Sequence, residues 1–342
     1  MKAIVYSRTG DSDVLYLIDR PTPEPGPGEV RVRIVISGVN PTDWKSRRGT
    51  RPGEVTPFEQ MVPNQDGSGV VDAIGAGVKS LKIGQRVWIW EAAWGRSDGT
   101  AQEHVVLPVR HVVALPDSAS YDLGASLGIP ALTAHRCLTV SEGSPKLLQP
   151  GVLKGNVVLV SGGAGAVGHA AIQLARWAGA TVITTVSSEA KAELARLAGA
   201  DHVVNYLGKN ASAVIRSLAP NGINSVVEVN LAVNRELDLK VTAPGATVAI
   251  YAASAGSEVS LPLRDHMVQN ARFQFVFVYT VPAEAKDAAV SAVSAALADG
   301  ALSIGDTAGL PTVRFPLEQT AMAHDAVEGG AIGKVLIDVS KP

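Results

Sequence analysis

Glycine recurs every third residue in the segment SGGAGAVGH, at Gly162, Gly165 and Gly168. A short apolar run precedes this segment, and apolar residues at helical spacing follow it. On a turn between a strand and a helix, glycine lets backbone amides approach a pyrophosphate, and the helix N-terminus adds unpaired donors. Tight packing of helix on strand would also favour glycine, but the spacing and its context favour a dinucleotide site. We expect the coenzyme to contact Gly162, Gly163, Ala164, Gly165, Ala166, Val167 and Gly168.

The end of the second predicted strand indicates which dinucleotide binds. An acidic residue there would accept the ribose hydroxyls of NAD and repel a 2′-phosphate. The segment TVITTVSSEAK instead places Ser187 and Ser188 at this point, with Lys191 close behind. The two hydroxyls and the ammonium favour NADPH. Lys191 can alternatively be a solvated residue of the following helix, and Glu189 adds negative charge nearby. Tyr206, after the third predicted strand, either stacks on the adenine edge or is an ordinary strand-end tyrosine.

The composition argues against several other classes of protein. The chain has 342 residues, 46% of them hydrophobic, and a formal net charge of -2, which gives no electrostatic support for binding nucleic acid. Residues 157–175 lack charges, but their four glycines would each weaken a spanning helix by about 1 kcal/mol relative to alanine. A single cysteine, Cys137, allows no intrachain disulfide and no zinc site built on several thiolates. The N-terminal residues show no secretory signal, so we expect a cytoplasmic protein without membrane contact.

The chain divides into two regions that differ in their predicted secondary structure, and these regions hold the residues named above. Up to about residue 116, short strand-like runs alternate with Gly/Pro-rich turns, as is typical of a β-rich, barrel-like module. From about residue 123, strands and helices alternate in the order typical of a parallel sheet with covering helices. The sequence therefore predicts an α/β protein with two structural units.

Together these features resemble the medium-chain dehydrogenase/reductase superfamily across nearly the whole chain. The likeness rests on the β-rich front, on residues 161–206 around the glycine turn and on the ending GKVLIDV. Within the superfamily, the chain is most similar to the zeta-crystallin-like quinone oxidoreductases. The resemblance implies a GroES-like β-barrel catalytic domain (residues 1–124 and 280–342) and a doubly wound Rossmann domain (residues 125–279). It also implies NADPH in the cleft between them, and a homodimer or homotetramer.

The resemblance further indicates a reductase without zinc. Zinc alcohol dehydrogenases of this superfamily take catalytic ligands from Cys-x-Thr/Ser-Asp, from Gly-His-Glu and from a further cysteine. The aligned segments here are NPTD, NQD and GIPALT, which place Asn40, Gln65 and approximately Pro130 at the ligand positions. None of the three offers a thiolate or an imidazole, and the short segment WEAAWGRSDGT replaces the four-cysteine structural lobe. We therefore expect no metal site.

Several site residues are implied by the same resemblance. Asn40 would donate a hydrogen bond to the substrate oxygen, and Asp43 would organise the loop, although a plain β-turn would also explain NPTD. Lys45 stands where many relatives have a tyrosine, which leaves a proton-donating role there open. The residues expected to line the coenzyme are Pro41, Thr42, Thr133, Asn230, Tyr251, Phe277, Val278, Gly333 and Lys334.

The other aromatic, cysteine and histidine residues that could take part in binding or catalysis are assigned structural roles. Trp88 and Trp90 lie two apart on one predicted strand and so share a face, which we assign to the core, whereas the role of Trp94 stays open. Cys137 lies in an apolar helix and is assigned to the core, and the seven scattered histidines are assigned to packing or to the surface. Residues 273–279, FQFVFVY, are a candidate edge strand for pairing two subunits.

The main hypothesis is an NADPH-dependent reductase of quinones or α,β-unsaturated carbonyl compounds. Without a metal ion or flavin, a hydride from NADPH can go directly to a quinone or to the β-carbon of an enone. Two alternatives remain: an enoyl- or acrylate-type reductase of a single pathway, and a nucleotide-gated binding protein without turnover.

Overall fold

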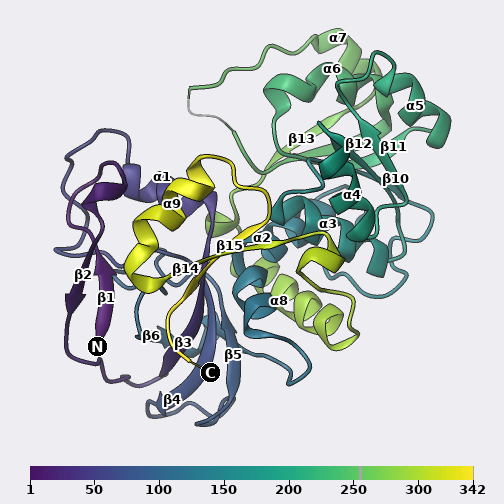
Figure 1. Ribbon diagram of the computed structural model, residues 1–342. Coiled ribbons are helices and arrows are strands. Elements are labelled where there is room, and N and C mark those ends of the chain that lie inside the picture. Colours follow the sequence, from purple (N-terminus) through teal and green to yellow (C-terminus); the bar gives the residue numbers. More distant parts are fainter. Residues whose placement is uncertain (254–255, 342) are drawn as a thin grey trace. The chain divides into compact units, whose positions relative to one another are not determined.

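The computed structural model describes residues 1–253 and 256–341, which form two compact units (Figure 1). One unit comprises Pro130–Pro311, and the other comprises the chain up to Ile129 together with the C-terminal segment from Thr312. Figure 1 shows the C-terminal elements, in yellow, returning to the strands of the N-terminal segment. We describe each unit separately.

The first unit is built on a seven-stranded, largely antiparallel sheet. Its order is β14-β15-β3-β4-β5-β7, with β6 also paired to β3. A separate antiparallel pair is formed by β1 and β2. The elements are β1 (Lys2–Val5), β2 (Tyr16–Asp19), β3 (Glu29–Val39), α1 (Pro41–Arg48), β4 (Asp66–Ile74), β5 (Arg86–Ile89), β6 (His104–Pro108), β7 (Val112–Ala114), β14 (Thr312–Pro316), α9 (Thr320–Glu328) and β15 (Lys334–Asp338).

The central strand β3 shows why this sequence forms such a sheet. In its first half, Val30, Val32 and Ile34 are fully buried, while the alternating Arg31 and Arg33 are partly exposed. This alternation is typical of a strand with one face in the core and one in water. From residue 35 to residue 39 every residue is buried, because both faces are then covered. The predicted burial of Trp88 and Trp90 is confirmed, and Trp94 is partly exposed.

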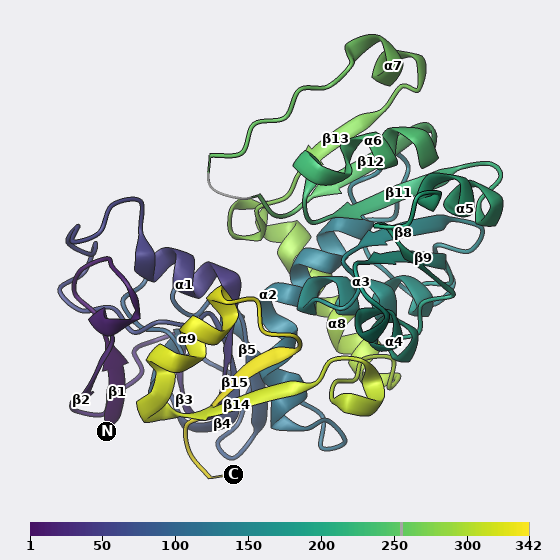
Figure 2. The same ribbon diagram turned by 45° about the horizontal axis from the view of Figure 1, so that its top comes forward.

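The second unit is a doubly wound parallel sheet of six strands, in the order β10-β9-β8-β11-β12-β13 (Figure 2). The strand order reverses between β8 and β11, and such a switch point is where open parallel sheets bind ligands. Helix α2 (Tyr121–Leu138) leads into this unit. The elements that follow are β8 (Val157–Ser161), α3 (Ala166–Trp177), β9 (Thr181–Val186), α4 (Glu189–Leu197), β10 (His202–Asn205), α5 (Ala211–Leu218), β11 (Ile223–Glu228), α6 (Leu231–Val241), β12 (Thr242–Ile250), α7 (Leu263–Val268), β13 (Arg272–Phe275) and α8 (Ala283–Ala298).

The observed division of the chain differs from the expected boundaries. We expected the nucleotide-binding domain to end at residue 279, yet the second unit continues to Pro311. The reason lies in the contacts of α3: His169 hydrogen-bonds the carbonyl oxygen of Ala308 at 2.8 Å, and Gln173 donates to the carbonyl oxygen of Ser303 at 3.2 Å. The predicted strand at 273–279 is also shorter than expected. It ends at Phe275, and a 3₁₀ turn occupies Val278–Thr280.

We expect His169 to make the protein sensitive to acid. Burial lowers the pKa of His169 from 6.5 to about 4. The hydrogen bond to Ala308 raises this pKa, but its effect is smaller than that of burial. Because the folded state holds this ring neutral, its contribution to stability is complete above pH 6.5 and is lost as pH falls toward 4. The loss between pH 7 and pH 5 is about 2 kcal/mol for this group.

Denaturant unfolding at pH 7 and pH 5 tests this expectation. The variant His169→Gln should lose about 2 kcal/mol less than the natural protein over this interval. His202→Gln, in the same unit, is the matched control. An unchanged pH dependence in His169→Gln would contradict the assignment.

Candidate functional site

The glycine turn connects β8 to α3 at the switch point of the parallel sheet. Gly162 has φ of +73°, a conformation that L side chains rarely adopt. A Cβ on Gly163 would lie 2.2 Å from Oγ1 of Thr184, and one on Gly168 would lie 2.4 Å from the carbonyl oxygen of Gly162. The fold itself therefore requires glycine at these three positions. This agrees with the alternative interpretation, in which glycine serves the tight packing of helix on strand.

Gly165 is different, because its surroundings are open. A Cβ there would approach nothing closer than 3.5 Å, and the residue is solvent-exposed at the N-terminus of α3. In the part of the chain that the structure describes, the backbone amides of Ala164, Ala166 and Val167 donate to no protein acceptor. An exposed helix N-terminus with unpaired amides and an open cradle fits a pyrophosphate.

Gly165→Val should therefore weaken NADPH binding without unfolding the protein. The branched side chain would occupy the open space in which we place the pyrophosphate. It would not clash with the protein, because a Cβ at this position approaches no atom beyond its chain neighbours closer than 3.5 Å. We expect the Kd for NADPH, measured by titration calorimetry, to rise at least about ten-fold, with Tm little changed. Gly168→Ala is the contrasting variant, because its Cβ clashes with backbone and should lower Tm. Unchanged NADPH affinity in Gly165→Val would contradict the placement.

The carboxyl end of β9 brings together the residues predicted to select NADPH. The Ser188 hydroxyl caps α4 by accepting a hydrogen bond from the Lys191 amide at 3.3 Å. The Lys191 ammonium lies 3.4 Å from the hydroxyl oxygen of Ser187. Glu189 pairs with Arg196 at 2.9 Å, which offsets its negative charge. The result is a hydroxyl and an ammonium at one strand end, suited to a phosphate.

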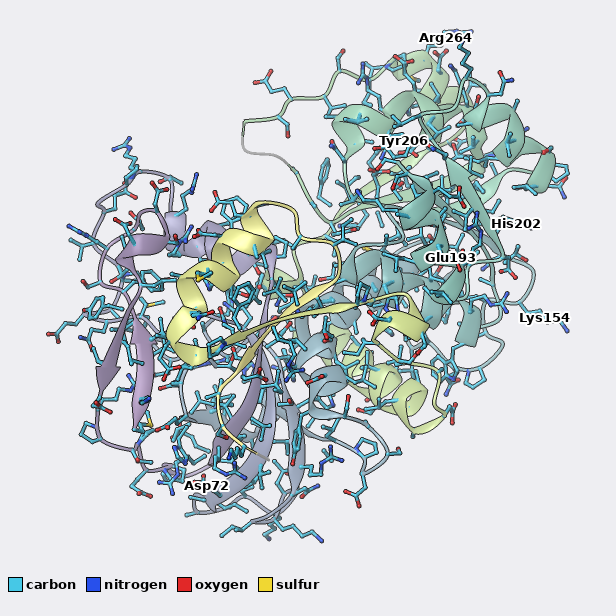
Figure 3. The ribbon with its side chains drawn as sticks, viewed as in Figure 1. Asp72, Lys154, Glu193, His202, Tyr206 and Arg264 are labelled. Carbon is cyan, nitrogen blue, oxygen red and sulfur yellow. The ribbon has the colours of Figure 1, made fainter. Side chains whose placement is uncertain are left out.

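Tyr206 follows β10, the strand next to β9, and its amide donates to the carbonyl oxygen of Val186 (Figure 3). This places Tyr206 beside the same strand end as the serines. Asn230 follows β11 as the N-cap residue of α6, and Tyr251 follows β12, so both lie at the carboxyl edge of the sheet. Phe277 is half-exposed, whereas Val278 and Thr133 are buried in the same unit. The predicted coenzyme residues of this unit thus lie at or near its carboxyl edge, apart from Thr133, which lies in α2.

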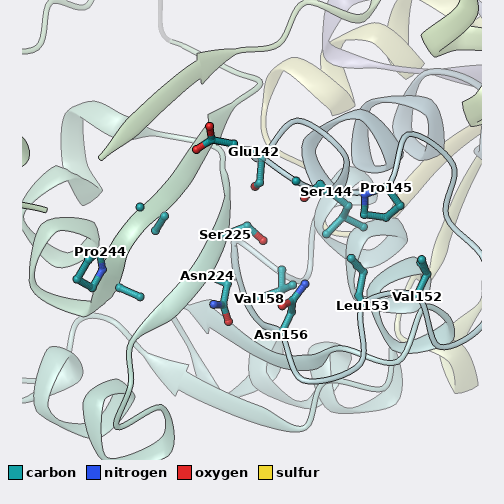
Figure 4. A pocket seen from close by; sticks show the side chains of 16 residues that line it. Glu142, Ser144, Pro145, Val152, Leu153, Asn156, Val158, Asn224, Ser225 and Pro244 are labelled. Carbon is teal, nitrogen blue, oxygen red and sulfur yellow. The ribbon is translucent and has the colours of Figure 1, made fainter. Parts of the chain in front are cut away.

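A hollow lies at the amino edge of this sheet, opposite to the glycine turn (Figure 4). It is lined by the amino ends of β8 and β11 and by the loop around Ser144 and Val152. Asn156, Asn224 and Ser225 surround it, and none of them belongs to the predicted site. The residues predicted to bind the coenzyme in this unit thus lie away from this hollow.

In the first unit, Asn40 is held between two charged side chains. The strands β15, β3 and β4 lie side by side, and Asn40 directly follows β3. The Lys334 ammonium, at the start of β15, donates to Oδ1 of Asn40 at 2.7 Å. Nδ2 of Asn40 donates to Oδ2 of Asp66, at the start of β4, at 2.7 Å. These two contacts fix which way the amide of Asn40 points.

Asp43 completes this buried cluster, which consists of Asn40, Asp43, Asp66 and Lys334. Its side chain accepts a hydrogen bond from the amide of Asn40 at 2.7 Å and another from the amide of Gln65 at 3.1 Å, so it ties together two segments of backbone. Burial raises the pKa of Asp66 to about 6 and that of Asp43 to about 8, and it lowers the pKa of Lys334. Each shift is opposed by the neighbouring opposite charge.

This cluster does not fit a catalytic zinc ion. Both ends of the Asn40 amide are engaged, and Oε1 of Gln65 accepts a hydrogen bond from the amide of Ala93 at 3.1 Å. The ammonium 2.7 Å from Asn40 would repel a divalent cation. Within residues 1–253 and 256–341, no three His, Cys, Asp or Glu side chains are grouped to hold a metal ion.

The other predicted residues of the first unit lie around this cluster. Pro41 and Thr42 begin α1, directly after Asn40, and Gly333 precedes β15 with φ of +107°. Lys45 is solvent-exposed, and its ammonium lies over the ring of Trp44 at 5.7 Å rather than in the cluster. The cluster's Asp66 was missed as a site residue, because a lone aspartate in NQD carries no signal until the strands are aligned.

Comparison with known proteins places the chain in a family. Residues 26–117 match the profile described as an alcohol dehydrogenase GroES-like domain, and residues 166–295 match that of a zinc-binding dehydrogenase. A quinone oxidoreductase from Sus scrofa is 30% identical over 98% of this chain and 97% of its own. The chain belongs to the medium-chain dehydrogenase/reductase superfamily. Its similarity to the zeta-crystallin-like quinone oxidoreductases extends over nearly its full length.

Solved structures agree with the fold. A structure described as an NAD-dependent alcohol dehydrogenase is 30% identical, with a TM-score of 0.85, and covers 99% of this chain and 100% of its own. A mycobacterial protein complexed with NADPH is 27% identical, with a TM-score of 0.79, over 98% and 99% of the two chains. The predicted GroES-like and Rossmann folds are confirmed, and the chain is an oxidoreductase of the superfamily's type. Among the described residues, no helix combines the length and the apolar character that crossing a membrane requires.

Proposed function

We propose that this protein is an NADPH-dependent reductase that reduces quinones or α,β-unsaturated carbonyl compounds without a metal ion. The observation that carries the proposal is the arrangement of Asn40 between Lys334 and Asp66. A hydrogen-bond donor of fixed orientation stands where the superfamily's metal enzymes have a zinc ligand. A reaction that needs only a hydride and a polarised carbonyl fits such a site.

The glycine turn and the strand end at β9 would hold the coenzyme. The free amides of Ala164, Ala166 and Val167 suit its pyrophosphate, and Ser187 with Lys191 suits a 2′-phosphate. When bound, NADPH supplies a hydride. Because one similar structure is described as NAD-dependent and another contains NADPH, coenzyme choice rests on the residues at β9.

Asn40 would bind the substrate oxygen. One hydrogen of its Nδ2 is used by Asp66, and the second is available to a carbonyl oxygen as that oxygen gains negative charge. Lys334 on Oδ1 draws electron density from the amide and strengthens this donor. Asp43 fixes the backbone of the loop, and water can supply the proton that completes the reduction.

The test is NADPH oxidation by the purified protein, followed by loss of coenzyme absorbance. We expect turnover with 1,4-naphthoquinone or with an α,β-unsaturated ketone, and no loss of activity after dialysis against a chelator. A substrate panel decides between quinones and enones. The absence of turnover with every electrophile, or activity that requires added zinc, would refute the proposal.

We also propose that the protein is a homodimer or homotetramer and that it acts in the cytoplasm. Among the residues that the structure describes, β13 pairs with β12 alone, and its other edge would accept a strand of a second subunit. Phe275 on this strand is 70% exposed, and Leu263 and Met267 on α7 are each 74% exposed, which are apolar surfaces that association would cover. Light scattering coupled to gel filtration measures the assembly.

A further inference from the structure

The hollow at the amino edge of the parallel sheet has a volume of about 270 Å³ and lies entirely within the second unit. Figure 4 shows the side chains of Asn156, Asn224 and Ser225 around it. Asn156 directly precedes β8, and the other two residues lie near the start of β11. The volume is slightly below the range typical of pockets for drug-sized ligands, so an occupant would be a smaller molecule.

Most of the polar side chains in this lining lack a partner in the protein. In the part of the chain that the structure describes, the side chains that line the hollow and form no hydrogen bond include Ser141, Ser144, Asn156 and Ser225. The hydroxyl oxygen of Ser141 is buried, and Ser225 is 9% exposed. Asn224 accepts from the amide of Val157 at 2.8 Å through Oδ1, which leaves its Nδ2 for another partner. Polar groups removed from bulk water in this way are stabilised when a ligand or ordered water reaches them.

The charge and the shape of the lining narrow the class of ligand. Glu142 is the only charged residue of the lining among the described residues, and its carboxylate pairs with Arg272. The guanidinium of Arg272 also donates to the carbonyl oxygen of Gly245 at 2.8 Å, so both charges are engaged. Within residues 1–253 and 256–341, no aromatic side chain lines the hollow, and a nucleobase or another flat ring would have no surface on which to stack. These features favour a ligand that is neither charged nor aromatic.

Hydroxyl and carboxamide groups both donate and accept hydrogen bonds, which matches a ligand that carries several hydroxyl groups. Val152, Leu153 and Pro244 add apolar contacts for the carbon skeleton of such a ligand. We propose that this hollow binds a small, uncharged polyhydroxy compound, of the class of polyols and monosaccharides. The site is separate from the residues assigned to hydride transfer, so the proposal does not depend on the reductase function. The alternative is a hollow that holds only water.

A titration followed by nuclear magnetic resonance tests the proposal. Glycerol, D-glucose and myo-inositol are added separately to isotope-labelled protein saturated with NADPH, so that the coenzyme occupies its own site. Cyclohexanol, a ring with a single hydroxyl group, is the control compound. We expect at least one of the three polyols to shift the side-chain amide signals of Asn156 and Asn224, with a Kd at least about ten-fold lower than that of cyclohexanol.

The double variant Asn156→Ala/Ser225→Ala should weaken binding of that polyol at least about ten-fold, because it removes several hydrogen-bonding groups. Its Tm should change little, since neither side chain bonds to the described protein. Asn221→Ala, at an exposed position outside the lining, should bind like the natural protein. The proposal is wrong if no polyol binds more tightly than cyclohexanol, or if the double variant binds like the natural protein. If the double variant does not fold, the natural protein still decides, because polyol binding that leaves the signals of Asn156 and Asn224 unmoved places the ligand elsewhere.

Discussion

Lys334→Met is expected to lower the free energy of unfolding by about 3–5 kcal/mol, the cost typical of breaking a buried ion pair from one side. Lys334 is 1% exposed, and its ammonium is the buried positive charge that attracts both Asp66 and Asp43. Methionine has a similar length but no charge. Because the pKa of Asp43 is about 8 and that of Asp66 is about 6, Asp66 is the group that is ionised at pH 7, and the variant leaves its carboxylate without a cation. That carboxylate must then take up a proton or draw in water.

The double variant Lys334→Met/Asp66→Asn tests the origin of this loss. If the loss arises from an uncompensated carboxylate, removing that charge should recover about 0.5–3 kcal/mol relative to the sum of the single variants. Denaturant unfolding of the four proteins at pH 7 measures the coupling. Additive effects of the two substitutions would show that Lys334 contributes by packing alone.

The same variants report on catalysis through Asn40. With Lys334 removed, Oδ1 of Asn40 loses its donor and the amide is free to turn over. We expect kcat to fall more than KM rises, since the donor hydrogen bond is strongest in the transition state. A variant that lost stability but kept kcat would confine Lys334 to a structural role.

The features that could be predicted from the sequence are those that depend on residues close together in the chain. The glycine turn follows a strand and begins a helix as expected, because a left-handed residue and close backbone approaches leave a direct mark on residue type. The burial of Trp88 and Trp90, predicted from their spacing on one strand, is local in the same sense. Strand alternation and helical spacing likewise located most elements.

The sequence could not predict contacts between distant segments. Lys334 and Asp66 are separated by more than 260 residues, and only the order β15-β3-β4 brings them to either side of Asn40. The extension of the second unit to Pro311 depends in the same way on His169 reaching Ala308.

Ser187→Asp is expected to reverse the proposed preference for NADPH. A carboxylate at this position would lie where we place the 2′-phosphate, and it would also pair with Lys191, whose ammonium is 3.4 Å from the present hydroxyl. Both effects oppose NADPH, whereas a carboxylate can accept the ribose hydroxyls of NADH. A repulsion of about 3 kcal/mol, which is within the range for like charges a few ångströms apart near a protein surface, corresponds to about a hundred-fold change.

Steady-state kinetics with both coenzymes measure this change as the ratio of kcat/KM for NADPH to that for NADH. Ser187→Ala should reduce the ratio by less than about ten-fold, because it removes one hydrogen bond and adds no charge. Glu189→Gln should leave the ratio nearly unchanged, since the Glu189 charge is already offset by Arg196 at 2.9 Å. If the natural protein used the two coenzymes equally, Ser187, Ser188 and Lys191 would not form a phosphate site, and Ser187→Asp would have no preference to reverse.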